Sequence, residues 1–268
     1  KKKYYTAMLG DGVNDLPAIK EAEIGIAMEE GSSITKEVAD IVLLKNKFAL
    51  LPHIFSEGNR IVNTVNAVAK LFLTKNALVI LIALLSMIFS LDFPLTPRRV
   101  SFINLFTIGL PAFIIALRNT QISPSKRFFT DLFSFVLVSS IFVTMAGYTA
   151  AWIAKVIFPE YYESFDMVSL TAMIFTALAG YLFVASLVDK ERWNFHWYYA
   201  GGIVLLYLFV TIFSFENIIY TAIKIFYEIE FIPWLLWLII LPVSIVFALG
   251  LFWTNTMRHR LLFGKDAR

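Results

Sequence analysis

The sequence of 268 residues contains no cysteine, which excludes disulfide bonds and thiolate metal sites. Charged residues are also scarce, at 16% of the chain, whereas 59% of the residues are hydrophobic and 26 are phenylalanine. A water-soluble globular protein usually has about 25% charged residues, so most of this chain is not expected to be a soluble globule. The formal net charge is only +3 and the basic residues are scattered, so nucleic-acid binding is not expected either.

The amino terminus has neither an initiating methionine nor a signal peptide. Three lysines are followed by Tyr4 and Tyr5, without the apolar region and cleavage site that a signal peptide requires. The first motif with clear chemistry already follows at residues 8–15. We therefore expect the sequence to begin in the middle of a domain.

Residues 1–50 alternate between strand-like and helix-like segments. The order βαβαβ predicts parallel strands, and ligands bind such sheets at the carboxyl ends of the strands. A segment of this length is too short to fold as an independent domain of this type, so the remaining strands must come from elsewhere. The strands are expected at 4–9, 24–28 and 41–44, and the helices at 16–22 and 33–39.

Six apolar segments follow, and each is long enough to cross a bilayer, for which a helix needs about 20 residues. We place these spans at 69–90, 100–117, 132–157, 167–188, 198–215 and 232–256. The predicted fold class is therefore mixed, with a partial α/β segment followed by a six-helix transmembrane domain. The predicted divisions are an α/β segment at 1–50, a connecting helix at 51–68, a membrane domain at 69–257 and a tail at 258–268.

The distribution of basic residues predicts the orientation in the membrane. Loops on the side of the α/β segment hold nine lysines and arginines, and the opposite loops hold four. By the positive-inside rule, both termini are expected in the cytosol of a multi-pass protein, which we place in the plasma membrane. Arg98 and Arg99 lie on the opposite side and do not follow the rule.

The first predicted strand ends in the sequence Gly-Asp-Gly-Val-Asn-Asp. Gly10 and Gly12 can adopt backbone angles that let Asp11 project from the strand end. Mg²⁺ prefers carboxylate and phosphate oxygens with waters, so Asp11 is predicted to bind Mg²⁺ directly and Asp15 to bind it or to orient the site. Asn14 offers an amide N–H to a phosphoryl oxygen. The alternative is a turn rich in Asp and Asn that only caps the helix starting near Asp15.

A longer set of motifs surrounds this turn. GDGVNDLPA at 10–18 is followed by IGIAM at 24–28, KEVADIVLL at 36–44 and EGNR at 57–60. Together they resemble the end of the phosphorylation domain of P-type (E1–E2) cation-transporting ATPases, which has a haloacid-dehalogenase-like fold. The resemblance extends through 94–117 and, by helix count, to the carboxyl terminus. It implies that Asp11 coordinates Mg²⁺ beside an aspartyl phosphate, that Asn14 contacts the phosphoryl group and that Asp15 supports the site.

Other parts of that family's machinery are missing from the sequence. The family's nucleophile lies in a DKTGT motif, which these 268 residues do not contain, and its phosphate-binding lysine has no clear match. The actuator domain, the nucleotide domain that binds most of the ATP, and the first four membrane helices are also missing. The resemblance therefore implies the carboxyl-terminal portion of an ATP-driven pump, which needs its amino-terminal domains as partners and should not hydrolyse ATP alone. The alternatives are a non-catalytic membrane subunit or truncated product, and a passive channel or secondary transporter.

Polar residues in the second span predict a cation site. Asn104, Thr107, Ile108 and Pro111 fall on one face of an α-helix. Pro111 lacks an N–H and displaces the carbonyl group of Thr107, which predicts an unwound stretch where Asn104 and Thr107 offer oxygens to a cation. The alternative is a proline kink in which both side chains make hydrogen bonds between helices. Residues 104–111 resemble the ion-binding sixth helix of calcium-type pumps, although Ile108 stands where that subfamily usually has Asp.

The first span adds Asn76 and Lys75 to this prediction. The resemblance implies that Asn76 is a neutral ligand, but Val79 replaces the Glu expected one turn later. A two-ion calcium site is therefore not expected, and one cation, with calcium as the leading ion, would need a Glu from a helix outside this chain. Lys75 either extends its ammonium group to the interface or acts as an internal counter-ion after the cation leaves.

Two further features give weaker functional signals. Asn63, Asn66 and Lys70 are interpreted as a polar stripe that is solvated or packed on the soluble domain. His196 is interpreted as an isolated histidine near the membrane interface.

Overall fold

The structure is a computed structural model that describes residues 5–91, 93–119, 127–189, 191–212 and 218–264. The chain divides into two compact units, residues 1–58 and 59–268. The first contains a small parallel sheet and the second is helical, so the predicted fold class is confirmed. The finer divisions at residues 50, 68 and 257 stay predictions.

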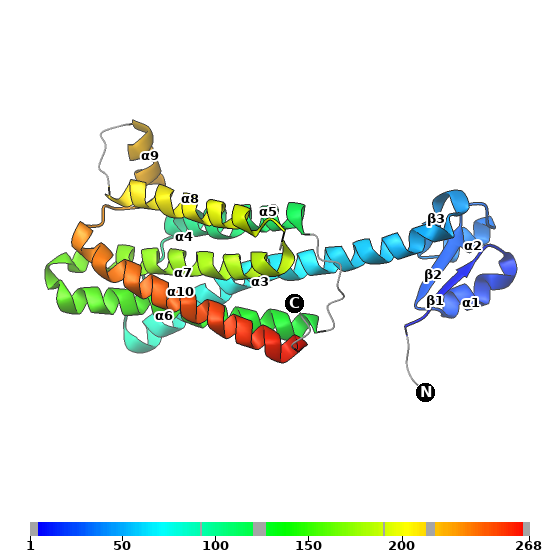
Figure 1. The fold of residues 1–268 in the computed structure, drawn as a ribbon, viewed down its shortest axis with the longest axis horizontal. Helices are drawn as coiled ribbons and strands as arrows, with labels where there is room; N and C mark the ends of the chain where they lie inside the picture. The colour runs from blue at the N-terminus through cyan, green and yellow to red at the C-terminus, as the bar shows by residue number, and fades with distance from the viewer. Residues whose placement is uncertain (1–4, 92, 120–126, 190, 213–217, 265–268) are drawn as a thin grey trace. The chain divides into compact units, whose positions relative to one another are not determined.

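The first unit is a three-stranded parallel sheet with two crossover helices (Figure 1). The strand order follows the sequence, and the two helices contact each other, which places both on the same face of the sheet. Its buried core is small because few apolar side chains contribute to it, chiefly Ile19, Ile26 and Leu43. The elements are β1 (Ala7–Gly10), α1 (Leu16–Glu21), β2 (Ile24–Met28), α2 (Ser33–Val38) and β3 (Ile41–Leu43).

The second unit contains the membrane-length helices. Six helical segments among the described residues are long and apolar enough to cross a membrane, as the sequence predicts. The first of them, α3 (Leu51–Phe89), is one continuous helix, and the boundary between the two units falls within it. The others are α4 (Pro97–Ile103) continuing through a π-helix (Asn104–Gly109) into α5 (Leu110–Arg118), then α6 (Phe128–Ile157), α7 (Phe165–Val188), α8 (Trp193–Ile212) and α10 (Trp234–Phe263). The short helix α9 (Ile218–Tyr227) was not predicted from the sequence.

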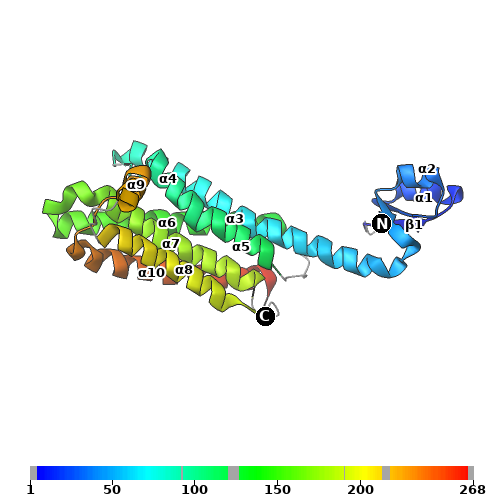
Figure 2. The same cartoon turned by 90° about the horizontal axis from the view of Figure 1, so that it is seen from above.

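Helix α7 forms the centre of the second unit. It packs against both α6 and α10, which also contact each other, and the three lie side by side in both views (Figures 1 and 2). Small residues let the helices approach closely. A Cβ added at Gly147 of α6 would lie 2.3 Å from Cε of Met173 and 2.8 Å from the hydroxyl oxygen of Ser169, so α6 and α7 approach closely at this glycine. Helix α7 is therefore the most deeply buried of the six candidate spans.

Arg99, which does not follow the predicted charge distribution, has a structural role. Its side chain is buried, donates to the carbonyl oxygens of Pro94 and Glu228 at 3.2 Å each, and pairs with Asp166 at 3.1 Å. These bonds tie the start of α4 to α7 and to the segment before α10. An arginine whose side chain is held by bonds within the protein is weaker evidence for membrane orientation than a basic residue in a solvated loop.

Candidate phosphate site and membrane cavity

The turn after β1 is organised by the carboxylate of Asp15. Its Oδ2 atom accepts hydrogen bonds from the backbone N–H groups of Asp11 and Gly12, each at 3.2 Å. A Cβ added at Gly10 would lie 2.7 Å from the same oxygen, so this close approach requires glycine. Asp15 therefore caps the turn and fixes its shape, in keeping with a role in orienting the site.

The loop that follows β2 and the first turn of α2 hold the same turn. Ser32 donates its backbone N–H to the carbonyl oxygen of Asp11 at 2.9 Å, and the Thr35 hydroxyl donates to the carbonyl oxygen of Gly12 at 3.0 Å. A Cβ added at Gly31 would lie 2.7 Å from the Asp11 carbonyl oxygen. The backbone of the turn is thus held at the carboxyl edge of the sheet by the Asp15 carboxylate, by the loop after β2 and by α2.

The side chains that could meet a phosphate remain accessible. Asp11 and Asn14 are exposed, while Asp15 is half-buried. Among the described residues there is no group of three or more His, Cys, Asp or Glu side chains that could hold a metal by themselves. Mg²⁺ commonly takes only one or two carboxylates and completes its shell with waters and phosphate oxygens. The exposed carboxylate of Asp11 fits that donor set, with Asp15 turned toward the backbone.

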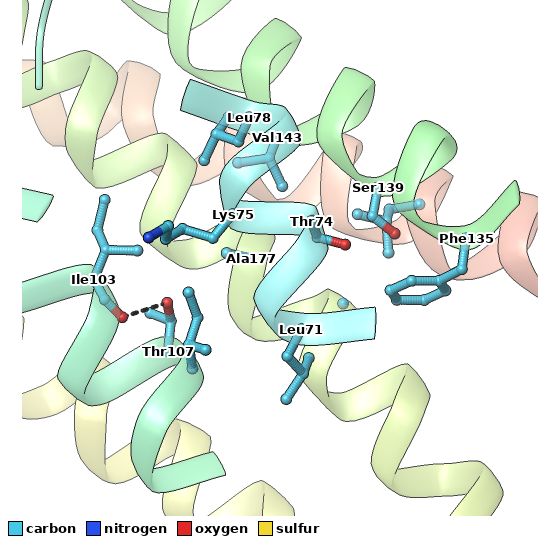
Figure 3. A pocket seen from close by; sticks show the side chains of 13 residues that line it. Leu71, Thr74, Lys75, Leu78, Ile103, Thr107, Phe135, Ser139, Val143 and Ala177 are labelled. Atoms are coloured by element: carbon cyan, nitrogen blue, oxygen red, sulfur yellow. Dashed lines mark hydrogen bonds between the residues drawn. The ribbon is translucent and has the colours of Figure 1, made fainter. Parts of the chain in front are cut away.

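A small cavity lies inside the helical unit, between α3, the π-helix, α6 and α7 (Figure 3). Its free volume is about 30 Å³, which is room for one or two water molecules and no more. Four polar side chains reach its wall, and the rest of the lining is apolar. The four are Thr74 and Lys75 from α3, Thr107 from the π-helix and Ser139 from α6.

Two hydroxyl groups on the cavity wall, those of Thr74 and Thr107, have oxygen lone pairs that could accept a hydrogen bond or coordinate a cation. Thr107 donates its proton to the carbonyl oxygen of Ile103 at 2.8 Å, the bond drawn in Figure 3, so its oxygen lone pairs stay available. The hydroxyl oxygen of Thr74 is buried and has no hydrogen-bond partner among the described residues. A buried hydroxyl without a partner is uncommon and needs a water, an ion or a ligand to satisfy it. Thr74 was not predicted as a site residue, because a threonine in an apolar helix gives no distinct signal in the sequence.

The predicted cation residues divide into two groups. Lys75 and Thr107 line the cavity together, and in Figure 3 the Lys75 side chain extends from α3 toward Ile103 and Thr107. Asn76 and Asn104 are exposed and do not line it. The structure therefore brings together one residue from each predicted helix and leaves the two asparagines on other faces.

The local backbone explains why Asn104 and Thr107 separate. Residues Asn104–Gly109 form a π-helix, and the N–H of Leu110 bonds to the carbonyl oxygen of Leu105, five residues back. The prediction of an unwound stretch is wrong, because the wider turn gives the ring of Pro111 space and keeps the segment helical. The prediction that Asn104 and Thr107 share one face assumed α-helical spacing. Residues three apart no longer align when the hydrogen bonds connect residues five apart.

A buried ion cluster lies elsewhere in the same unit, and the interpretation of Lys70 as solvated or packed on the soluble domain is wrong. The Lys70 ammonium group pairs with Asp131 at 2.6 Å, and Arg258 pairs with the other carboxylate oxygen of Asp131 at 2.7 Å. All three residues are at most 9% exposed. Arg258 also bonds to Asn255, whose amide group donates to Ser139 on the cavity wall at 3.4 Å. A hydrogen-bonded path thus joins the ion cluster to the cavity.

His196 is not isolated either, so that interpretation is also wrong. Its Nδ1 atom lies 2.6 Å from the Tyr181 hydroxyl and its Nε2 atom 3.1 Å from a carboxylate oxygen of Asp189. All three side chains are fully or almost fully buried between α7 and α8. The signal in the sequence was weak, because Asp189 and His196 are near in sequence but Tyr181 lies two helical turns before Asp189.

Comparison with known proteins bears on both units. Residues 2–49 match the family model for haloacid dehalogenase-like hydrolases. Over 217 residues the chain is 36% identical to calcium-transporting ATPase CtpE of Mycobacterium bovis. The matched region covers 76% of this chain and 27% of that protein. The predicted resemblance to cation-transporting ATPases is confirmed. Two further relatives show the same pattern.

The first of these is calcium-transporting ATPase CtpE of Mycolicibacterium smegmatis, 37% identical over 197 residues, or 69% of this chain and 24% of that protein. The second is "Probable cation-transporting ATPase exp7" of Streptococcus pneumoniae, 33% identical over 168 residues, or 57% of this chain and 22% of that protein. The chain thus spans about a quarter of the length of these relatives. Together with the six membrane-length helices, the similarity indicates a multi-pass integral membrane protein.

Proposed function

We propose that the chain is the carboxyl-terminal part of a P-type ATPase that pumps a cation, with the turn at residues 10–15 serving the phosphate site. The observation that carries this proposal is the geometry of Asp11. Its backbone is held at the carboxyl edge of a parallel sheet while its carboxylate stays exposed, in a chain similar to calcium-transporting ATPases. A carboxylate in that position is suited to Mg²⁺ beside a phosphoryl group.

Each residue of the turn has a distinct proposed task. Asp11 would bind Mg²⁺, which when present would neutralise charge on the transferred phosphoryl group. Asn14 would donate a hydrogen bond to a phosphoryl oxygen, and Asp15 would keep the turn in shape through its two backbone bonds. Gly10 and Gly12 would allow the close approach of the backbone. ATP itself would be bound mainly by a nucleotide domain, and the phosphorylated aspartate would come from a segment with the DKTGT motif. We propose that the isolated chain is inactive without them.

The cavity in the helical unit is the proposed place for the transported cation. Thr74 and Thr107 would supply neutral oxygens, and a volume of about 30 Å³ suits one ion rather than two. None of the described lining residues is a carboxylate, so a divalent ion would need one from a helix outside this chain. Asn76 and Asn104 are exposed and do not line this cavity, so they would take part only in a conformation in which their helices turn them toward it. Calcium is the leading ion because two of the relatives are named calcium-transporting ATPases. Another divalent cation, a monovalent cation or a small organic cation is the alternative.

Lys75 is proposed to act as the internal counter-ion. Its position on the cavity wall beside Thr107 supports that role over an ammonium group extended to the interface. The positive charge would fill the cavity when the cation leaves and would be displaced when one enters. Helix α3, which runs from Leu51 to Phe89, would carry motion from the phosphate site to this cavity. We also propose a cytosolic location for both termini and the plasma membrane as the compartment.

The deciding experiment is ATP hydrolysis by the complete assembly, this chain together with the DKTGT-bearing segment, across a panel of cations with Mg²⁺ present. We expect one cation to stimulate hydrolysis and Asp11→Asn to abolish the stimulation. Glu21→Gln is the matched control, because Glu21 is an exposed carboxylate on α1 of the same unit. Hydrolysis that responds to no cation, or that Asp11→Asn leaves intact, would instead support a non-catalytic membrane subunit or truncated product.

A further inference from the structure

One carbonyl group in the π-helix lacks its normal backbone partner. Within this segment the N–H of Leu110 bonds to the carbonyl oxygen of Leu105, five residues earlier. The next bond in the same register would run from residue 111 to the carbonyl oxygen of Phe106. Residue 111 is proline and has no N–H to give. The Phe106 carbonyl group therefore needs a donor from outside the segment.

Helix α8 supplies that donor. The hydroxyl group of Tyr199 donates to the carbonyl oxygen of Phe106 at 2.7 Å, across 93 residues of sequence. The ring of Tyr199 is half-buried and stands edge-on to the ring of Tyr181, with the ring centres 5.7 Å apart. Tyr181 is in turn bonded to His196. The donor is thus held by a packed set of side chains rather than reaching in from solvent.

The same π-helix forms one wall of the cavity. Thr107 and Ile108 lie directly after Phe106 and both line it. Their direction depends on the wide turn, because a return to α-helical spacing would rotate every residue that follows. π-Helical turns inside α-helices are rare and are frequently found at functional sites. A bond that stabilises the turn therefore also fixes where the Thr107 hydroxyl points.

We propose that Tyr199 is a positioning residue, which holds the π-helix open through the Phe106 carbonyl group and so sets the cation affinity of the cavity. The affinity part of this inference rests on the proposed pump function; the structural part does not. The predicted coupling is specific, since Tyr199 matters only because residue 111 is proline. With an N–H at residue 111, the Phe106 or Thr107 carbonyl group would regain a backbone partner and the segment could narrow.

The test is a double-mutant cycle between Tyr199→Phe and Pro111→Ala in the complete assembly. Tyr199→Phe should raise the cation concentration for half-maximal ATPase activity by roughly threefold to tenfold, the range that one neutral hydrogen bond accounts for. Maximal activity should change much less. In the Pro111→Ala background, Tyr199→Phe should have little further effect. Tyr198→Phe is the matched control, because Tyr198 is the adjacent residue and is 79% exposed.

A second measurement keeps this inference separate from the proposed function. The thermal midpoint of the purified chain should fall with Tyr199→Phe when residue 111 is proline and hardly fall when it is alanine. If the wild-type assembly responds to no cation, the pump proposal fails, and the thermal cycle still decides whether Tyr199 holds the turn. Equal losses in both backgrounds would identify an ordinary packing contact and overturn the inference. The inference would also be overturned if the Tyr199→Phe variant kept the wild-type thermal midpoint and, in an assembly that a cation stimulates, the wild-type cation affinity.

Discussion

The buried cluster of one carboxylate and two cations makes an unequal prediction for its members. Asp131 lies between Lys70 on α3 and Arg258 on α10, at 2.6 and 2.7 Å. Removing Asp131 with Asp131→Asn would leave two buried positive charges without their anion. Removing Lys70 with Lys70→Met would leave Asp131 still paired with Arg258. The two substitutions should therefore differ in cost although they break the same contact.

The magnitudes follow from what each variant leaves unpaired. Breaking a buried ion pair so that a charge is stranded costs about 3–5 kcal/mol, which is the expectation for Asp131→Asn. Losing one hydrogen bond to a charged group costs about 1.5–3 kcal/mol, which sets the upper range for Lys70→Met. Part of that loss is offset, since the cluster gives up an excess positive charge. We expect Lys70→Met to cost less than half as much as Asp131→Asn.

The assay is reversible unfolding of the detergent-solubilised chain, followed by helical circular dichroism against denaturant. Lys75→Met is the control, because this lysine lies five residues further along α3 and is only half-buried. It should change the free energy of unfolding least. Equal losses for Lys70→Met and Asp131→Asn would refute the reasoning, because they would mean that Arg258 does not compensate the Asp131 charge.

Two further predictions concern the cavity and the first unit. If Lys75 is a counter-ion, Lys75→Met should lower turnover or change its pH dependence in the complete assembly, whereas unchanged transport would leave only an ammonium group extended to the interface. In the first unit, hydrogen bonds from the Thr6 hydroxyl and backbone N–H hold the pKa of Glu23 below its ordinary value. The resulting stabilisation is present above the pKa of the unfolded chain and is lost as the pH falls through the lower pKa of the folded chain. Thr6→Val should raise the Glu23 pKa in an NMR titration, and the stability difference from wild type should narrow in acid; an unchanged pKa would contradict this.

The fold class was predictable because its signals are local. Each strand and helix of the first unit shows its own short pattern, and each membrane span needs only an apolar stretch of sufficient length. The turn at residues 10–15 was found for the same reason, since glycine and aspartate are close in sequence. The capping bonds of Asp15 span only three or four residues and follow directly from that spacing.

The membrane site was predicted less well because its geometry depends on distant residues. Pro111 correctly marked an irregular segment, but the period of an α-helix was then applied across it to group Asn104 with Thr107. Whether a proline unwinds a helix or widens it is decided by what receives the free carbonyl group. Here that group is Phe106, and its partner Tyr199 lies on another helix. No pattern within the segment contains this information.

Buried polar residues in general are hard to interpret from the sequence, because their partners are distant in sequence. The sequence places Lys70 at the end of one predicted span and Asp131 just before another, and nothing in it shows that they pair across 61 residues. The cost of burying them becomes intelligible only when the partners are known. Asn255 bonds to Arg258 through its oxygen and to Ser139 through its amide nitrogen, so one side chain is shared between the ion cluster and the cavity wall. Buried charges that would be destabilising without partners therefore help to hold the Ser139 hydroxyl group on the wall of the proposed cation site. This is a physical reason to keep them buried.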